Sequence, residues 1–236
     1  MEYSIGAGYL KEKIMGAEAG DIQSRAGSLR RTMMEAGACL VGFADLSCLS
    51  PEATKGYPVG IGFALEYDLD AVDSLPHKEP FLSMKADVED KVKEIYAIMA
   101  TVLDGWGYGY TRISSGVLPG EPPFPPEPLP QKAIATLAGL GWIGKSSLLV
   151  SPDYGPRVRL GAMLTDGSLL TDKPVVYSVC GDCNLCVEAC PVGAIKGANW
   201  TQGVERSDLF DVRLCYEHRR DSLCELCLKA CPIGRQ

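Results

Sequence analysis

Apolar residues recur at helical spacing in three stretches of the chain, and these predict its helices. Residues 21–36 have apolar side chains on one face and are followed by Gly37, which predicts an amphipathic helix that ends there. Residues 80–103 carry a longer apolar stripe and predict a second helix. A short helix is expected at 131–138. Each of these helices would turn one apolar face toward a core.

Short apolar runs between the helices predict buried strands. The runs cover residues 38–44, 59–65, 108–113, 147–150 and 157–164. A turn sequence at 151–156 separates the last two runs, so we expect them to pair as a hairpin. The acidic stretch 66–73 is expected to be a loop. Helices and strands mixed in this order predict an α/β (α+β) domain over residues 1–172, which we expect to bind a cofactor or substrate.

Prolines and glycines crowd residues 116–130. So many prolines exclude a regular helix or a central strand. A loop of this length inside a compact domain is usually functional or disordered. We expect an ordered loop that lines a cavity, and a surface linker is the alternative.

The glycine-rich stretch after the short helix matches two phosphate-binding patterns. Gly139, Gly141 and Gly144 give G-x-G-x-x-G, and the residues from Gly139 to Ser146 give a Walker A string. Both patterns require a strand before the loop and a helix after it. Here a helix precedes and a strand follows. We therefore expect the glycines to let the backbone approach another chain segment or a flat cofactor.

Composition and charge indicate which kinds of binding partner the protein can have. The 236 residues are 46% hydrophobic and 22% charged, which is typical of globular proteins. The net charge of −7 opposes nonspecific binding to nucleic acid or to a membrane surface. The sequence has neither an export signal nor an apolar run of the roughly 18 residues that a membrane span requires. We expect a cytoplasmic protein with no membrane partner.

Eight of the ten cysteines lie between Cys180 and Cys231. The first run has the C-x2-C-x2-C-x3-C-P spacing of bacterial ferredoxins, in which the fourth cysteine binds the other cluster. Zinc sites and disulfides are the alternatives. Residues 173–236 therefore predict a module with two [4Fe-4S] clusters. The expected ligands are Cys180, Cys183, Cys186 and Cys231 for one cluster, and Cys190, Cys215, Cys224 and Cys227 for the other.

Together, the block from Ala138 to Lys145 and the first cysteine run resemble the epoxyqueuosine reductase family, in particular its short relatives. The resemblance implies a nitroreductase-like core, which reductive dehalogenases share, with cobalamin bound there and reduced by the nearer cluster. It implies a cofactor site beside the glycine-rich block and the proline-rich loop. The residues expected there are Lys132, Gly139, Gly141, Trp142, Gly144, Lys145 and Arg157.

One catalytic position of that family differs in this chain. The reductases carry an Asp as proton donor just before the glycine-rich block, and Pro125 stands at that place. Lys132 stands where the reductases tend to have Arg. The remaining candidates for a proton donor are Glu127, Tyr108 and Tyr110.

The sequence thus predicts an iron–sulfur oxidoreductase. Electrons would come from a ferredoxin or flavodoxin-like donor and pass to a small molecule or a corrinoid. The alternative is an electron-transfer protein that has no chemistry of its own and reduces a partner protein. The net charge argues against nucleic acid as a partner.

Overall fold

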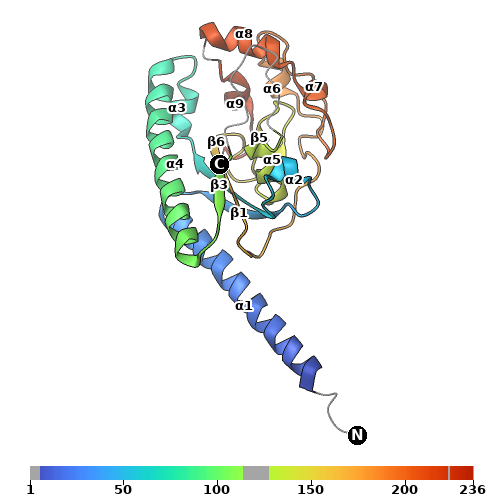
Figure 1. Cartoon of the computed structure of the whole chain (residues 1–236). Coiled ribbons are helices and arrows are strands. Elements are labelled where there is room, and N and C mark those ends of the chain that lie inside the picture. The colour runs from blue at the N-terminus through green and yellow to red at the C-terminus, as the bar shows by residue number, and fades with distance from the viewer. Residues whose placement is uncertain (1–5, 114–127, 223, 236) are drawn as a thin grey trace.

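The computed structural model describes residues 6–113, 128–222 and 224–235, without the side chains of residues 6–20 and 221. An antiparallel four-stranded sheet with the order β1-β2-β6-β3 lies at its centre (Figure 1). The strands are β1 (Leu40–Asp45), β2 (Val59–Glu66), β3 (Tyr110–Arg112) and β6 (Val158–Thr165). The mixed α/β architecture predicted from the sequence is confirmed.

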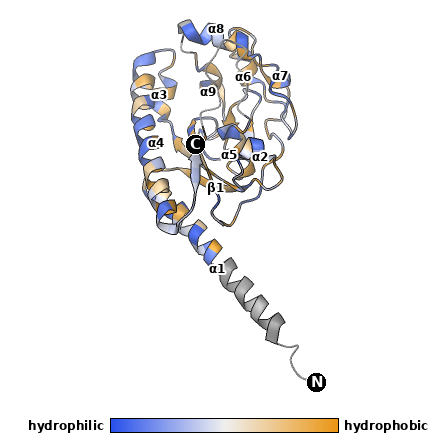
Figure 2. Ribbon diagram, in the orientation of Figure 1, coloured by the Kyte–Doolittle hydropathy of each residue, from blue (hydrophilic) through white to orange (hydrophobic). Residues whose placement is uncertain are grey.

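Two long helices, α1 (Gly6–Glu35) and α4 (Lys78–Trp106), cover one face of the sheet. Their apolar stripes bury Leu29 and Met33 from α1, and Ile95 and Met99 from α4, against strand residues. Figure 2 shows hydrophobic and hydrophilic colours alternating along α4. Helix α1 begins well before the predicted residue 21, because residues 6–20 contain no proline and several good helix formers.

The opposite face of the sheet is covered by the short helix α5 (Gln131–Leu137). Glycines on this face allow the helix and its C-terminal end to approach the strands closely. A Cβ atom at Gly42 would overlap the carbonyl oxygen of Ala138, and one at Gly60 would lie 3.0 Å from Cγ2 of Ile134. The sheet is therefore the middle layer of three, and α5 is held against it by backbone proximity.

The acidic stretch 66–73 is not the loop that the sequence predicted. It contains the short helix α3 (Leu69–Asp73), and a second short helix, α2 (Pro51–Thr54), lies between β1 and β2. Asp68 caps α3, because its Oδ1 accepts a hydrogen bond from the Ala71 amide at 2.8 Å. An aspartate at an N-cap stabilises even a short helix.

The predicted hairpin between 147–150 and 157–164 is also wrong. Strand β5 (Leu149–Val150) pairs with β4 (Trp142–Ile143) in a separate two-stranded sheet, whereas β6 lies between β2 and β3. The turn between β5 and β6 does form, with the backbones of Ser151 and Gly155 paired. It leads the chain from one sheet to the other. β6 is apolar enough to be buried on both faces, which suits a central strand.

The C-terminal segment packs at one end of the domain, beside α3 and the beginning of α4 (Figure 1). Its helices are α6 (Leu185–Glu188), α7 (Arg206–Leu209), α8 (Val212–Ser222) and α9 (Leu226–Ala230). Lys229 on α9 donates hydrogen bonds to the carbonyls of Asp73 and Leu75, and Arg235 forms an ion pair with Asp73 at 2.9 Å. In the described part of the chain, no helix is long and apolar enough to cross a membrane.

Gly42→Ala tests the close approach of α5 to the sheet. We expect a loss of about 1–3 kcal/mol in the free energy of unfolding, because the added methyl group overlaps the Ala138 carbonyl. The melting temperature should fall by about 2–10 °C, measured by circular dichroism. Gly27→Ala is the matched control, since a Cβ there meets nothing within 4 Å and the site is helical. Equal melting temperatures for the two variants would contradict the packing argument.

Candidate iron–sulfur and acceptor site

Four of the predicted ligands form one group around Cys186. Burial raises the pKa of the Cys186 thiol to about 11, and the neighbouring charges of Cys180, Cys231 and Cys183 raise it further. Cys231 comes from the C-terminal end of the chain and the others from the first cysteine run. The fold therefore brings Cys231 close to the first cysteine run.

The other four cysteines form a second group. Burial raises the pKa of Cys215, and among its neighbours the charges of Cys190 and Cys224 act in the same direction. Burial raises the pKa of Cys227 to about 12, with further effects from Glu225, Cys215 and Cys224. Cys186 also contributes to this shift, and α6 packs on α9. The two groups are thus neighbours.

The chemistry of these donors suits iron–sulfur clusters. Thiols are the ligands that a [4Fe-4S] cluster requires, and the cysteines of the C-terminal segment are free of disulfides. Among the described residues, no three His, Cys, Asp or Glu side chains converge on one metal ion. A cubane does not require such convergence, because each of its four cysteines binds a different iron. Thiols must lose their protons to bind iron, so cluster binding would have to overcome the raised pKa values of Cys186 and Cys227.

The glycine-rich block is a turn that lies against other backbone segments. A Cβ at Gly139 would lie 2.7 Å from the Lys173 carbonyl oxygen, and one at Gly141 would overlap the Val150 carbonyl. A Cβ at Gly144 would lie 3.6 Å from the sulfur of Cys180. Strand β4 lies within this stretch, and the next described element after it is strand β5. The block therefore lacks the strand–loop–helix order of a phosphate-binding loop.

Two basic residues that we expected at the cofactor form hydrogen bonds to the cysteine loops. Buried Lys145 donates to Oδ1 of Asn184 at 2.9 Å, between two cluster cysteines in the sequence. Buried Arg157 donates to the carbonyls of Cys231, at 3.1 Å, and Ile233. Burial, and then the charge of Arg235, lowers the pKa of Arg157. Both side chains reach the module, and neither lines the cavity described below.

Trp142 on β4 is buried but is not a member of either apolar core. Its neighbour Ile143 packs into the core beneath α5. Gly144, which the sulfur of Cys180 approaches, follows Trp142 by two residues in the sequence. Within the described residues, the indole N–H has no hydrogen-bond acceptor. Sulfur atoms of a cluster at Cys180 would be suitable acceptors.

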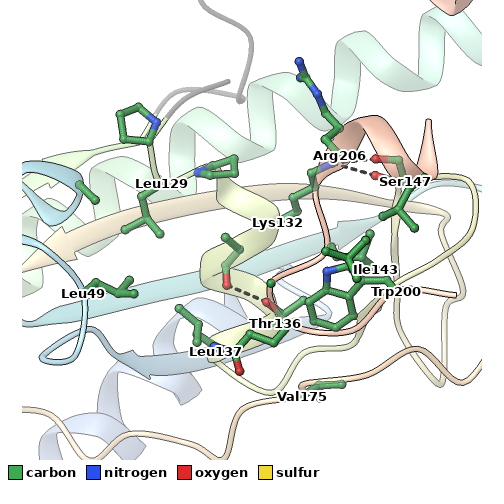
Figure 3. A pocket seen from close by; sticks show the side chains of 18 of the residues that line it. Leu49, Leu129, Lys132, Thr136, Leu137, Ile143, Ser147, Val175, Trp200 and Arg206 are labelled. Atoms are coloured by element: carbon green, nitrogen blue, oxygen red, sulfur yellow. Dashed lines mark hydrogen bonds between the residues drawn. The ribbon is translucent and has the colours of Figure 1, made fainter. Parts of the chain in front are cut away.

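A cavity of about 500 Å³ lies between α5 and the C-terminal segment (Figure 3). Its wall is mainly apolar, with Trp200 and Val175 from the C-terminal segment facing Leu137 and Ile143 from the domain. Residues 128–130, at the end of the proline-rich stretch, line it as predicted. The rest of that stretch, including Glu127, lies outside the described residues.

Lys132 is a charged residue in the lining of this cavity. Its Nζ donates to the carbonyl oxygen and to the hydroxyl of Ser147, each at 3.0 Å (Figure 3). Burial lowers the pKa of Lys132 to about 8, and the positive charge of Arg206 adds to the effect. Ser147 has φ = 60°, a left-handed conformation that is uncommon for residues other than glycine.

Tyr108 and Tyr110 lie elsewhere. Tyr108 packs with Trp106 and Arg25 at the end of α4, and the Tyr110 hydroxyl donates to Asp104 at 3.1 Å. Neither residue lines the cavity. Sequence reasoning missed other lining residues, above all Trp200 and Arg206, because they follow the first cysteine run and only the fold brings them beside α5. Ser147 lay inside the glycine-rich motif and could have been included.

Comparison with protein families supports the cluster module. A family model for the 4Fe-4S binding domain matches residues 173–196. Among curated proteins, the epoxyqueuosine reductase of Synechococcus sp. (strain RCC307) is 52% identical over 68 residues, which are 29% of this chain and 21% of that protein. The matched segment therefore spans about a fifth of the length of this relative.

Solved structures share the fold over most of the chain. Epoxyqueuosine reductase from Streptococcus thermophilus aligns with a TM-score of 0.55 at 19% identity, over 89% of this chain and 66% of that one. A catabolic reductive dehalogenase aligns with a TM-score of 0.65 at 21% identity, over 85% of this chain and 30% of that one. The chain thus carries a 4Fe-4S binding domain near its C-terminal end, and its predicted resemblance to epoxyqueuosine reductases is confirmed.

Proposed function

We propose that this protein is an iron–sulfur reductase that passes electrons through two [4Fe-4S] clusters to an acceptor in the cavity beside Lys132. The observation that carries the proposal is the position of the turn 142–147. Its residues Ile143 and Ser147 line the cavity, and Gly144 between them lies next to the sulfur of Cys180. One short turn therefore separates a cluster ligand from a cavity that can hold an acceptor.

The clusters in this proposal follow the crossed ligand pattern. The first takes Cys180, Cys183, Cys186 and Cys231, and the second takes Cys190, Cys215, Cys224 and Cys227. The two groups of cysteines whose charges influence one another support this division. We further propose that residues 173–236 are the ferredoxin-like module and that residues 1–172 form a nitroreductase-like core.

Electrons would enter from a ferredoxin or flavodoxin-like donor at the exposed side of the module. Large apolar side chains stand next to cluster ligands in the sequence and are exposed. They are Val179 at 61%, Leu185 at 46% and Leu214 at 42% relative exposure. Exposed apolar side chains beside redox centres suit transient docking of a carrier.

The acceptor that the fold favours is a corrinoid. One structural neighbour, with a TM-score of 0.64 at 20% identity, is a reductive dehalogenase solved in connection with B12-dependent dehalogenation. The cavity is mainly apolar and suits the edge of a macrocycle, but about 500 Å³ holds only part of a whole corrinoid. When bound, a corrinoid would supply a cobalt that accepts electrons singly.

The chain's own residues would position the acceptor and supply a proton. Trp200 and Ile143 would pack against its apolar surface, and Lys132 would bind its polar edge. Glu127 remains our proposed proton donor, since it precedes Pro128, which lines the cavity. Tyr108 and Tyr110 are disfavoured in this role because they do not line the cavity.

A second candidate substrate is a modified nucleoside in tRNA. One structural neighbour, with a TM-score of 0.57 at 19% identity, is an epoxyqueuosine reductase solved with an epoxyqueuosine-modified tRNA-Tyr stem loop. This likeness favours tRNA, against the expectation from the net charge of −7. A gel-shift titration can compare the affinities for such a modified stem loop and for an unmodified one. Tighter binding of the modified stem loop would favour tRNA as the substrate.

The first test is an anaerobic visible spectrum of the purified protein, with iron and cobalt counts, before and after adding cobalamin. We expect about eight irons per chain and a shifted corrinoid spectrum once cobalamin is added. Eight irons with no spectral response would rule out the corrinoid and favour an electron carrier or another acceptor. Fewer than about four irons would contradict the reductase proposal itself.

Cys190→Ala tests the crossed ligands. We expect the iron content to fall from about eight to about four per chain, because the second cluster loses a ligand while the loop of Cys180, Cys183 and Cys186 keeps all of its own. Mössbauer or electron paramagnetic resonance spectra should show one remaining cluster. Cys48→Ala is the control, since this exposed cysteine belongs to neither group. If Cys190→Ala loses the cluster held by Cys180, Cys183 and Cys186 instead, the crossed ligand assignment is wrong.

Trp142→Phe tests whether the buried indole N–H donates to cluster sulfur. Such a bond stabilises the more negative, reduced cluster. Removing a bond of about 1 kcal/mol should lower one midpoint potential by about 40 mV at unchanged iron content. Trp106→Phe is the control, because Trp106 packs with Tyr108 in the core beside α4. Equal potentials in both variants would refute this role.

A further inference from the structure

The charged groups that line the cavity are all cations within the described residues. Lys132 from α5 and Arg206 from α7 both line it, and its described lining contains no aspartate or glutamate. The remaining lining is apolar or neutral. The whole chain carries a net charge of −7, so a described lining that contains cations and no carboxylate differs from the composition of the protein.

The ammonium group of Lys132 has neutral partners. It has three N–H donors, and its acceptors in the described structure are the carbonyl and the hydroxyl of Ser147. Lys132 is half-buried, and a charged group that is partly removed from water is usually paired with an opposite charge. The lowered pKa of Lys132 has this cause, since burial and the charge of Arg206 both disfavour the protonated form.

A purely structural role for Lys132 explains only part of this arrangement. The side chain holds the left-handed turn at Ser147, whose conformation is strained. That task requires a hydrogen-bond donor and not a positive charge. It also does not explain why the same cavity receives a second cation from the other half of the molecule.

We propose that the cavity binds a small carboxylate with an apolar body, its carboxylate on Lys132 and its body against Trp200 and Ile143. The volume of about 500 Å³ is within the usual range for a small ligand. An anion there would compensate the charge of Lys132 and use its third N–H. This inference rests on the proposed function for one point, that the carboxylate is the reductase's substrate. The carboxylate and a corrinoid would then compete for the same lining residues of the cavity.

Benzoate and its neutral analogue benzamide are a matched pair of probes. The test uses the full chain with its clusters intact under anaerobic conditions and measures binding by calorimetry. We expect benzoate to bind about 10- to 100-fold more tightly than benzamide, since the pair differs by a charged hydrogen bond. Equal affinities would overturn the proposal.

Substitutions at two lining residues separate charge from structure. Lys132→Met should abolish the preference for benzoate, and Lys132→Arg should keep it. Ser147→Ala removes one acceptor of Lys132 but leaves the ammonium group, so it should also keep the preference. If Ser147→Ala loses the preference as completely as Lys132→Met at unchanged iron content, Lys132 acts only through the turn and the proposal is wrong.

The pH dependence of the wild-type protein gives a test that requires no variant. Lys132 carries its charge below its pKa of about 8 and loses it as the pH rises through that value, while Arg206 stays charged. The preference for benzoate should therefore fall between about pH 7 and pH 9. A constant preference across this range would contradict the role of Lys132.

These measurements stand apart from the test of electron transfer, because benzoate binding involves no reduction. If the protein binds benzoate but transfers no electrons, the reductase proposal is wrong and the proposal of a carboxylate-binding cavity stands. Cobalamin contains a phosphodiester, so it is the competing source of an anion. If cobalamin binds in a Lys132-dependent way and benzoate binds no more tightly than benzamide, the proposal of a small carboxylate ligand is wrong.

Discussion

The arrangement depends on two buried cations that attach the sheet domain to the cysteine loops. Lys145 binds Asn184, and Arg157 binds the carbonyls of Cys231 and Ile233. Arg157 bonds the carbonyl of a cysteine in the first group, and Gly155 permits the close approach of Ile233. A buried arginine that lost these carbonyls would leave several polar groups unsatisfied, so the contact fixes the C-terminal cysteine relative to the domain.

This attachment gives the cavity its composition. Because the C-terminal segment is held against the domain, Trp200 and Arg206 stand across from Lys132 and Ile143. Neither half of the chain forms the cavity alone. The glycines at 42 and 60 have a related effect, since they let α5 sink onto the sheet and carry Lys132 with it. The cavity is thus a product of close packing on both sides of α5.

Some differences from prediction have clear physical causes. The run 157–164 looked like a hairpin partner because a turn precedes it, and the turn does form. Pairing along the whole of β2 and along β3 engages more of its backbone than the two residues of β5 could. The loop prediction for 66–73 failed because a single cap, Asp68, was overlooked. Tertiary pairing decided the partner of β6, whereas a local cap decided the short helix α3.

The sequence by itself determined the cluster module, because iron ligation requires cysteines at fixed short spacings and those spacings are visible in the chain. It also determined the long helices, whose apolar stripes have a regular period. Only the tertiary structure decided what Lys145 and Arg157 bind, since a basic residue in a sequence carries no record of its partner. It alone decided the lining of the cavity, where Lys132 and Arg206 meet from segments that are separated by β4, β5 and β6 and by the first cysteine run.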